Sequence, residues 1–258
     1  MANPWLGIAL LLGVDACLLS SIWLVRRFAR LPEEVMRKLI HLSTTTVSLP
    51  FPWVFVAVWP AAILAGIAIG LMALARAPAL QPLVKGYGIG DSLRRDAWGE
   101  FYYPASIALL FAATLGEPVL YVVLLSAIGF GDAAAAVIGK AYGRLRYRTA
   151  GRETKSVEGS LAFLFVSFAG AIVALGGWSG LPPAEAAFLA VTACVYMALL
   201  EAIAWHGLDN LLAPFGGLLV FRILAGASAD ALLVQTSMAV AASVFAAGWL
   251  FWPRTAAA

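Results

Sequence analysis

Residues 129–160 read GFGDAAAAVIGKAYGRLRYRTAGRETKSVEGS, and this stretch decides how the rest of the chain is interpreted. It places one carboxylate, Asp132, inside an apolar segment and follows it with a run of small residues. The densest basic loop of the protein comes next and ends at Lys155-Ser156-Val157-Glu158-Gly159-Ser160. Because charged groups at membrane depth are costly and mark functional sites, we expect the other segments to hold this stretch in place.

The composition indicates a membrane protein. Of the 258 residues, 62% are hydrophobic and 12% are charged, and the mean hydropathy is +0.91. Soluble domains carry about 25% charged residues, and several segments here approach the ~20 apolar residues that span a bilayer. We therefore expect a single all-α domain over residues 1–258, a polytopic bundle of about seven to nine transmembrane helices.

The basic residues predict the orientation. Of 17 Lys and Arg residues, 15 lie in three connections, 26–38, 76–95 and 140–155. Cytoplasmic loops carry an excess of Lys and Arg, so an N-terminus outside the cell places all three connections, and the chemistry, in the cytoplasm. The net charge of +3 is then explained by contact with anionic lipid rather than with nucleic acid. No targeting segment is recognised, which favours a bacterial or archaeal plasma membrane.

Small residues line the helical face that Asp132 begins. Ala135, Ala136, Gly139 and Gly143 share this face at the 3.6-residue spacing. Such a face lets another helix pack closely, and that alternative explains the glycines but not the carboxylate. A buried carboxylate needs a partner, such as a cation or a metal ion, which favours a functional Asp132.

The end of the basic loop predicts a helix start. Ser156 can act as the N-cap, and Glu158 in the first turn suits the helix dipole. The free N–H groups of such an end, with Lys155 beside them, also make a phosphate site. Neither GxxxxGK[ST] nor GxGxxG occurs in the chain, so no soluble nucleotide-binding fold is indicated.

Three further clusters carry ionisable groups in apolar surroundings. They are Arg37-Lys38-x-x-His41, Gly99-Glu100-Phe101-Tyr102-Tyr103-Pro104, and Glu201 followed by Asp209-Asn210. Interfacial positions explain the cations and aromatics without any function. Taken together, however, acids that suit Mg²⁺ and cations that suit phosphates are the groups that phosphoryl transfer needs.

With these motifs in this order, the chain resembles the CTP-dependent lipid-alcohol kinases, which include dolichol, phytol and farnesol kinases and the yeast-type diacylglycerol kinase. The resemblance covers about residues 35–215, leaving 1–34 as a first span with a basic linker and 216–258 as C-terminal spans. The short chain is most similar to the phytol kinase branch and its prokaryotic relatives. The remaining motifs that match are Gly131-Asp132-x-x-Ala135-x-x-x-Gly139 and Lys155-Ser156-x-Glu158-Gly159-Ser160.

The resemblance implies transfer of a phosphoryl group from CTP, with Mg²⁺, to the hydroxyl of a membrane isoprenoid alcohol such as phytol, farnesol or a polyprenol. Carried onto this sequence, the catalytic candidates are Asp132, Lys155, Glu158, Arg37, Lys38 and His41. The nucleotide candidates are Gly131, Asp132, Gly139, Lys155, Ser156, Gly159 and Ser160. Asp132 and Glu158 would hold the metal, and the substrate-side candidates are Glu100, Tyr103, Glu201, Asp209 and Asn210.

Other functions stay open from the sequence. A related cytidylyltransferase would release pyrophosphate, and a diacylglycerol kinase would use a different acceptor. A small lipid or ion transporter would also bury acids but would bind no nucleotide. The base that takes the hydroxyl proton is also undecided, and His41 and Glu201 are the candidates. The oligomeric state is undecided too, although Gly66-xxx-Gly70 is a candidate dimer face.

Overall fold

The computed structural model of the 258-residue chain describes residues 3–29, 31–80, 82, 84, 98–149, 151 and 153–251. Five basic residues of the expected cytoplasmic connections lie outside these described residues: Arg30, Lys85, Arg94, Arg95 and Arg152.

Helices make up about four fifths of the described chain, as expected for an all-α protein. Their bounds are α1 Pro4–Phe28, α2 Glu33–Ser48, α3 Phe51–Val54, α4 Trp59–Ala75, α6 Gly99–Ala113, α7 Pro118–Ser126, α8 Asp132–Tyr142, α9 Val157–Trp178, α10 Pro183–Ile203, α11 Asp209–Leu224 and α12 Ala229–Phe251. A 3₁₀ turn covers Pro78–Leu80, and two short strands, β1 Arg146–Arg148 and β2 Thr154–Ser156, form an antiparallel hairpin.

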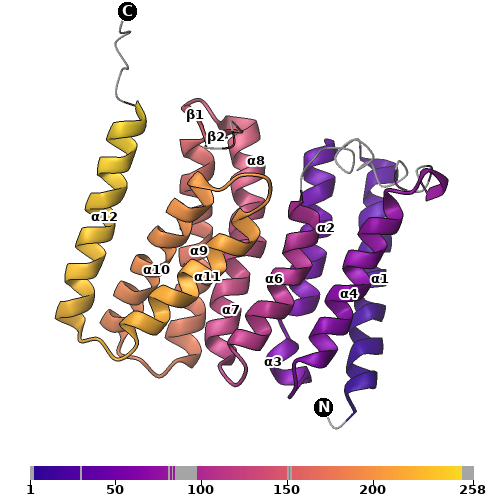
Figure 1. The fold of residues 1–258 in the computed structure, drawn as a ribbon, viewed down its shortest axis with the longest axis horizontal. Coiled ribbons are helices and arrows are strands. Elements are labelled where there is room, and N and C mark those ends of the chain that lie inside the picture. Colours follow the sequence, from indigo (N-terminus) through magenta and orange to yellow (C-terminus); the bar gives the residue numbers. More distant parts are fainter. Residues whose placement is uncertain are drawn as a thin grey trace, which may run out of the picture.

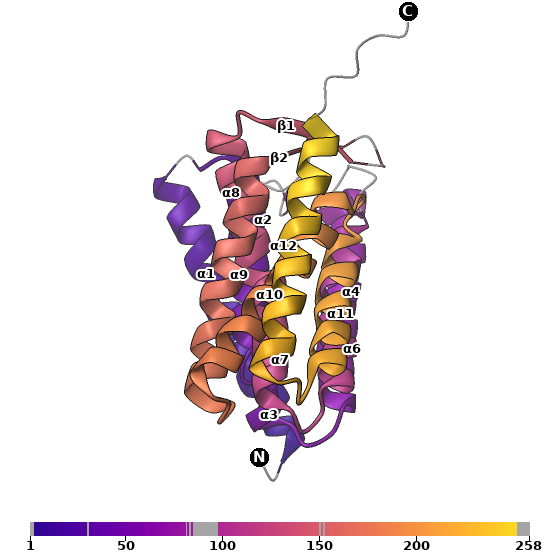
Figure 2. The ribbon, with the colours of Figure 1, turned by 90° about the vertical axis from the view of Figure 1, so that its left-hand side faces the viewer.

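The long helices run in alternating directions between two opposite ends of the bundle, except that α8 continues in the direction of α7 (Figures 1 and 2). The N-terminus lies at one end, and the β1–β2 hairpin lies at the other. In sequence order, α8 packs on α9, α9 on α10, and α10 on both α11 and α12. The ends of α1, α4 and α8, which carry or precede the basic connections, therefore gather on the same side as the hairpin.

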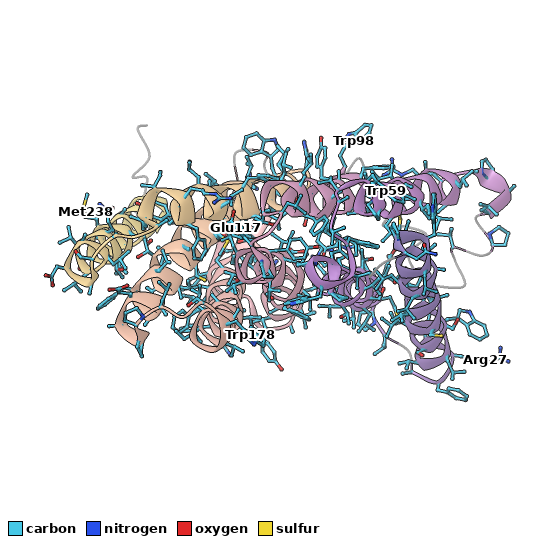
Figure 3. All side chains as sticks on the ribbon, turned by 90° about the horizontal axis from the view of Figure 1, so that it is seen from below. Arg27, Trp59, Trp98, Glu117, Trp178 and Met238 are labelled. Atoms are coloured by element: carbon cyan, nitrogen blue, oxygen red, sulfur yellow. The ribbon has the colours of Figure 1, made fainter. Side chains whose placement is uncertain are left out.

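Among the described residues, four helical runs are long and apolar enough to cross a membrane: Pro4–Phe28, Pro118–Tyr142, Val157–Trp178 and Pro183–Ile203. The helices α2, α4, α6 and α11 have 15 to 17 residues, shorter than the ~20 that span the hydrocarbon core. The outer surface carries large apolar side chains. Trp98, Trp178 and Met238 are 56%, 65% and 59% exposed, and they point away from the bundle (Figure 3). Such a surface suits lipid rather than water.

Aromatic side chains fill the core at the end opposite the hairpin. Phe51 packs edge-on against Phe111, and Tyr121 contacts both rings. The Tyr121 hydroxyl is fully buried and donates a hydrogen bond of 3.1 Å to the carbonyl oxygen of Ser48. This cluster ties α7 to the end of α2 and fixes the height at which the two helices face each other.

A π-helical turn, Ala127–Gly131, joins α7 to α8 immediately before Asp132. Such turns insert one extra residue into a helix and often occur at functional sites. The backbone of this turn lies against neighbouring helices. A Cβ at Gly129 would meet the Cβ of Thr45 at 2.9 Å, and one at Gly131 would meet Phe163 at 3.3 Å. Small residues are therefore required where the turn directs Asp132 toward α2.

The basic segments contain more regular secondary structure than the sequence suggested. Arg37 and Lys38, expected in a linker, belong to α2, and Lys140, expected in the loop, belongs to the last turn of α8. The β1–β2 hairpin was not expected at all. Its register pairs Tyr147 with Lys155, and the Tyr147 hydroxyl lies 2.6 Å from Ser160 Oγ, which fastens the hairpin to α9.

Candidate active site

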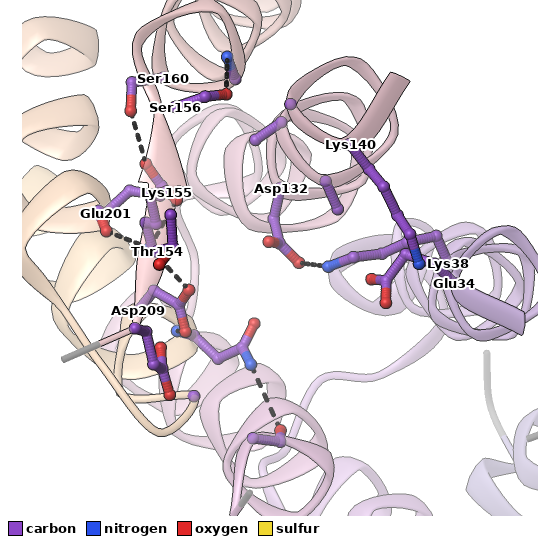
Figure 4. A pocket seen from close by; sticks show the side chains of 18 of the residues that line it. Glu34, Lys38, Asp132, Lys140, Thr154, Lys155, Ser156, Ser160, Glu201 and Asp209 are labelled. Atoms are coloured by element: carbon purple, nitrogen blue, oxygen red, sulfur yellow. Dashed lines mark hydrogen bonds and ion pairs between the residues drawn. The ribbon is translucent and has the colours of Figure 1, made fainter. Parts of the chain in front are cut away.

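A cavity of about 700 Å³ lies at the hairpin end of the bundle, between α2, α6, α8, the hairpin, and the ends of α10 and α11 (Figure 4). Ionisable groups dominate its walls. Among the described residues it is lined by five cationic side chains and six carboxylates: Arg37, Lys38, Lys140, Arg146, Lys155, Glu34, Glu100, Asp132, Glu153, Glu201 and Asp209.

One wall is built on the ion pair between Lys38 and Asp132, whose Nζ and Oδ2 are 2.5 Å apart. Their side chains are 5% and 15% exposed, so each charge depends on the other for compensation. His41, one turn after Lys38 on α2, brings its Nε2 to 3.5 Å from the same carboxylate oxygen. The sequence placed these residues in separate motifs, and the fold brings the motifs together.

His41 is held in one orientation from two sides. Its Nε2 lies 2.9 Å from the carbonyl oxygen of Ile128 in the π-helical turn, and its ring stacks on Tyr103 with centroids 3.6 Å apart. The Tyr103 hydroxyl lies 2.6 Å from Thr45 Oγ1. A carbonyl oxygen can only accept a hydrogen bond, so Nε2 carries the hydrogen and Nδ1 is the basic nitrogen.

The opposite wall is centred on Lys155 of β2. Its Nζ donates to Glu201 Oε1 at 2.6 Å, to the Glu201 carbonyl oxygen, and to Asp209 Oδ2 at 3.3 Å (Figure 4). Burial alone would lower the pKa of Lys155, but the carboxylates of Glu201 and Asp209 more than offset it and raise that pKa above the ordinary lysine value. Lys155 therefore stays protonated at neutral pH.

Between the two walls, α8 and α9 approach closely through small residues. A Cβ at Gly159 would lie 2.9 Å from the Ala135 carbonyl oxygen and 3.2 Å from the Cα of Gly139. Ser156 is the N-cap of α9, as expected, because its Oγ accepts a 3.1 Å hydrogen bond from the N–H of Gly159. The glycine face of α8 thus serves helix packing and also places the start of α9 at the cavity.

The N-terminus of α9 offers fewer free donors than the sequence suggested. The N–H of Val157 already donates to the Leu145 carbonyl oxygen at 2.9 Å, and that of Gly159 donates to Ser156. The Glu158 carboxylate does not line the cavity. It accepts hydrogen bonds from the N–H groups of Arg144 at 2.9 Å and Leu145 at 3.2 Å, so it fixes the chain entering β1 and does not meet Asp132.

The other expected site residues are placed in two groups. Arg37, Gly139, Ser156, Gly159, Ser160, Glu100, Asp209 and Asn210 line the cavity. Gly131 packs against α9 instead, and Tyr103 and His41 line an adjoining apolar space. The Arg37 guanidinium is engaged by Glu34, one turn earlier on α2. Asn210 donates through Nδ2 to the Gly99 carbonyl oxygen at 3.3 Å.

Several lining residues were missed from the sequence, namely Glu34, Lys140, Arg146, Glu153, Thr154 and His206. Glu34 lies one helical turn from Lys38, a spacing that would have found it. Glu153 gave no such signal. Its carboxylate accepts a 2.9 Å hydrogen bond from the N–H of His206, where the chain turns with positive φ at His206 and Gly207. This contact ties the hairpin to the α10–α11 turn.

The lining of the cavity would suit a magnesium ion that is bound together with phosphates. Within the described part of the chain, no group of three or more His, Cys, Asp or Glu side chains is arranged to hold a metal unaided. Mg²⁺ usually keeps several waters and binds through one or two carboxylates plus substrate phosphates. The cavity supplies carboxylates that could bind the ion and cations that could bind the phosphates.

Comparison with known proteins identifies the family. No family model matches the chain, and no solved structure gives a significant match. The chain is 31% identical over 224 residues to the protein named Phytol kinase from Synechocystis sp., and the alignment covers 85% of this chain and 92% of that relative. The resemblance inferred from the motifs is therefore confirmed. The chain belongs to the phytol kinase family, and it is a kinase that acts on an alcohol.

Proposed function

We propose that this protein transfers the γ-phosphoryl group of CTP to the hydroxyl of a membrane isoprenoid alcohol, such as phytol, farnesol or a polyprenol. One observation carries the proposal. Two ion clusters, Lys38–Asp132 and Lys155–Glu201–Asp209, face each other across a single cavity at one end of the bundle (Figure 4). A phosphoryl donor needs this combination of cations and carboxylates around it.

In this proposal the polar cavity holds the nucleotide. Its volume of about 700 Å³ is within the 300–1,000 Å³ of small-molecule sites. Arg37, Lys38 and Lys155 approach the phosphates from α2 and β2. Asp132 provides the metal-side carboxylate, and Glu158 assists by holding the loop before β1 rather than by direct contact. Bound Mg²⁺ would neutralise part of the negative charge of the phosphates, which the carboxylates of the cavity walls cannot do.

The hydroxyl of the acceptor lies on the His41 side of the cavity. His41 stands 3.5 Å from Asp132 and lines the adjoining apolar space, whereas Glu201 is committed to Lys155 on the far wall. We therefore assign His41, rather than Glu201, to accept the hydrogen bond of the hydroxyl through Nδ1. Positioning of this kind is the main task of the protein in a loose phosphoryl-transfer transition state.

The proposed topology has the N-terminus outside and the active site in the cytoplasm. In this topology the runs α1, α2, α4, α6, α7–α8, α9, α10, α11 and α12 would each cross the membrane, with α2, α4, α6 and α11 shorter than a usual span. The cavity and the basic connections 26–38 and 140–155 lie at the same end, as the positive-inside rule requires. A bacterial or archaeal plasma membrane suits this arrangement.

The test is a phosphoryl-transfer assay on purified protein in mixed micelles with Mg²⁺. γ-Labelled CTP or ATP is offered with phytol, farnesol, a short polyprenol or diacylglycerol. Asp132→Asn is expected to lower the rate at least about 100-fold, the size of effect seen when one transition-state electrostatic partner is removed. Asp230→Asn, at an exposed position of α12, is the matched control and keeps the wild-type rate.

Because Asp132→Asn leaves Lys38 buried without its partner, the double variant Lys38→Met/Asp132→Leu is assayed as well. It removes both charges together, so it is expected to fold and to be inactive. A folded Asp132→Asn protein with full activity would contradict the proposal. If α-labelled CTP gives a labelled CDP-lipid, the reaction is cytidylyl transfer instead of phosphoryl transfer. If the protein binds no nucleotide, a transporter function is favoured.

A further inference from the structure

Two smaller cavities continue from the polar cavity between α2, α4 and α6. We call the space they form the α2/α4/α6 groove. Its near part is lined by His41, Met72 and Tyr103, and its far part by Val47, Leu64 and Ile107, among others. Each part has a volume of about 80 Å³.

The three spaces are connected in series. Arg37, Gly99, Glu100 and Asn210 line both the polar cavity and the near part of the groove. The near and far parts then share Thr44, Ala68 and Pro104, one residue from each of the three helices. From Arg37 to Ser48, α2 contributes 11 residue steps, so the groove follows about 16 Å of helix, roughly half of the hydrocarbon thickness of a bilayer.

The chemistry of the lining changes along this direction. The polar cavity has ionic walls, the near part has Arg37 and Glu100 where it joins that cavity and then His41, Met72 and Tyr103, and the far part is mainly aliphatic, with Asp15 as its one carboxylate among the described residues. A molecule that follows the groove would therefore be polar at one end and hydrocarbon along the rest.

A second observation lies at the neck between the polar cavity and the groove. Asn210 is 9% exposed and donates through Nδ2 to Gly99, but its buried Oδ1 has no hydrogen-bond partner among the described residues. Buried acceptors without a partner are unfavourable and uncommon. An alcohol that enters through this neck could donate its one hydroxyl hydrogen to Asn210 Oδ1 before it turns to His41.

The groove is also open on one side. Leu12, Ile67 and Leu71 line its far part and are 37%, 36% and 58% exposed on the outer surface. Since the outer surface suits lipid, an alcohol dissolved in the membrane can enter sideways without crossing water. The two parts of about 80 Å³ each would enclose only the segment of a tail next to its hydroxyl, and the remainder would run along the open edge.

We propose that the α2/α4/α6 groove binds the hydrocarbon tail of the acceptor alcohol, with the hydroxyl at the Asn210–His41 neck and Ala68 as the residue that limits the passage. This inference rests on the proposed function for the identity of the occupant. Ala68 lies where the near and far parts meet, so a large side chain there would separate them.

The first experiment measures binding without phosphoryl transfer. A farnesol analogue with a diazirine on its tail is photolysed with the full-length protein in micelles, without nucleotide, and the labelled peptides are identified by mass spectrometry. We expect labelling in 61–72 of α4 and 103–107 of α6, reduced by excess phytol. Ala68→Phe should reduce this labelling about tenfold, the effect of overpacking a fitted site.

Ala62→Phe is the matched control. It adds the same ring to the same helix at an exposed position, so labelling should stay within about twofold of wild type. Ala65→Phe, which reaches only the far part of the groove, should weaken the binding of longer alcohols more than the binding of farnesol. It also keeps the test decisive if Ala68→Phe does not fold, as judged by gel filtration and thermal unfolding.

The outcomes separate the two proposals. Labelling spread over outward-facing helices, or labelling that neither Ala68→Phe nor Ala65→Phe changes, would overturn the groove assignment even if the kinase assay succeeds. Labelling confined to the groove in a protein that phosphorylates none of the tested alcohols would support the tail site while contradicting the kinase proposal.

Discussion

Lys155 and Glu201 form the most enclosed ion pair on the hairpin wall of the cavity, with Nζ and Oε1 2.6 Å apart. Their side chains are 17% and 6% exposed. The same ammonium also donates to the backbone carbonyl oxygen of Glu201. One lysine thereby satisfies both the side chain and the backbone at the end of α10, and it fastens the two-stranded hairpin to that helix.

Lys155→Met should destabilise the protein strongly. It leaves the Glu201 carboxylate buried without a cation, a change that costs about 3–5 kcal/mol at buried pairs. Thermal unfolding in detergent measures the effect, and Lys140→Met, at an exposed position on α8, is the control. An unchanged midpoint for Lys155→Met would mean that the ion pair contributes nothing to the folded state.

The pH dependence of this contribution has a definite sign. The carboxylates of Glu201 and Asp209 raise the pKa of Lys155 in spite of its burial. The stabilisation is therefore fully present below the ordinary lysine pKa of about 10.4 and is lost as the pH rises through the higher folded value. The difference between the wild-type and Lys155→Met midpoints should stay constant from about pH 7 to about pH 9 and shrink only above about pH 10.4.

Gly159→Ala should separate α8 from α9. The added methyl group would lie 2.9 Å from the Ala135 carbonyl oxygen, which cannot move without distorting α8, so a loss of about 1–3 kcal/mol is expected. Gly176→Ala, on the same helix with no atom within 4 Å of its Cβ, should leave the unfolding midpoint unchanged or raise it slightly. Equal effects of the two substitutions would argue against close packing at Gly159.

Metal removal should stop turnover without unfolding the protein. The described residues form no metal cage of their own, so the nucleotide-free protein should show the same unfolding midpoint with and without EDTA. Mg²⁺ should raise the midpoint only when CTP is present, because the ion binds together with the phosphates. A large drop with EDTA alone would reveal a structural metal site and would contradict this expectation.

The sequence was informative wherever a residue was out of place for its surroundings. Asp132 in an apolar helix, Glu201 deep in another, and Lys155-Ser156 before a helix start could each be recognised without coordinates, because charge and capping preferences are local. The helix bounds followed for the same reason. Ser156 was expected to cap a helix, for example, and α9 begins at Val157.

The pairing of these residues could not be predicted in the same way. Lys38 and Asp132 are 94 positions apart, and nothing in either motif says that α2 will lie beside α8. The hairpin was missed because its strands have three residues each, too few to show alternation. The role of Glu158 could not be assigned from the sequence either, since a helix-start glutamate suits both a metal site and the backbone hydrogen bonds that it makes here.

The π-helical turn before Asp132 has a consequence for how this family can vary. In an α-helix each residue advances the side-chain direction by about 100°, so loss of one residue from Ala127–Gly131 would rotate all of α8 relative to α7 while leaving every other residue unchanged. Asp132 would then face away from Lys38. The active site thus depends on the number of residues in this turn as well as on their chemistry. Insertions and deletions in Ala127–Gly131 should therefore be rarer than substitutions.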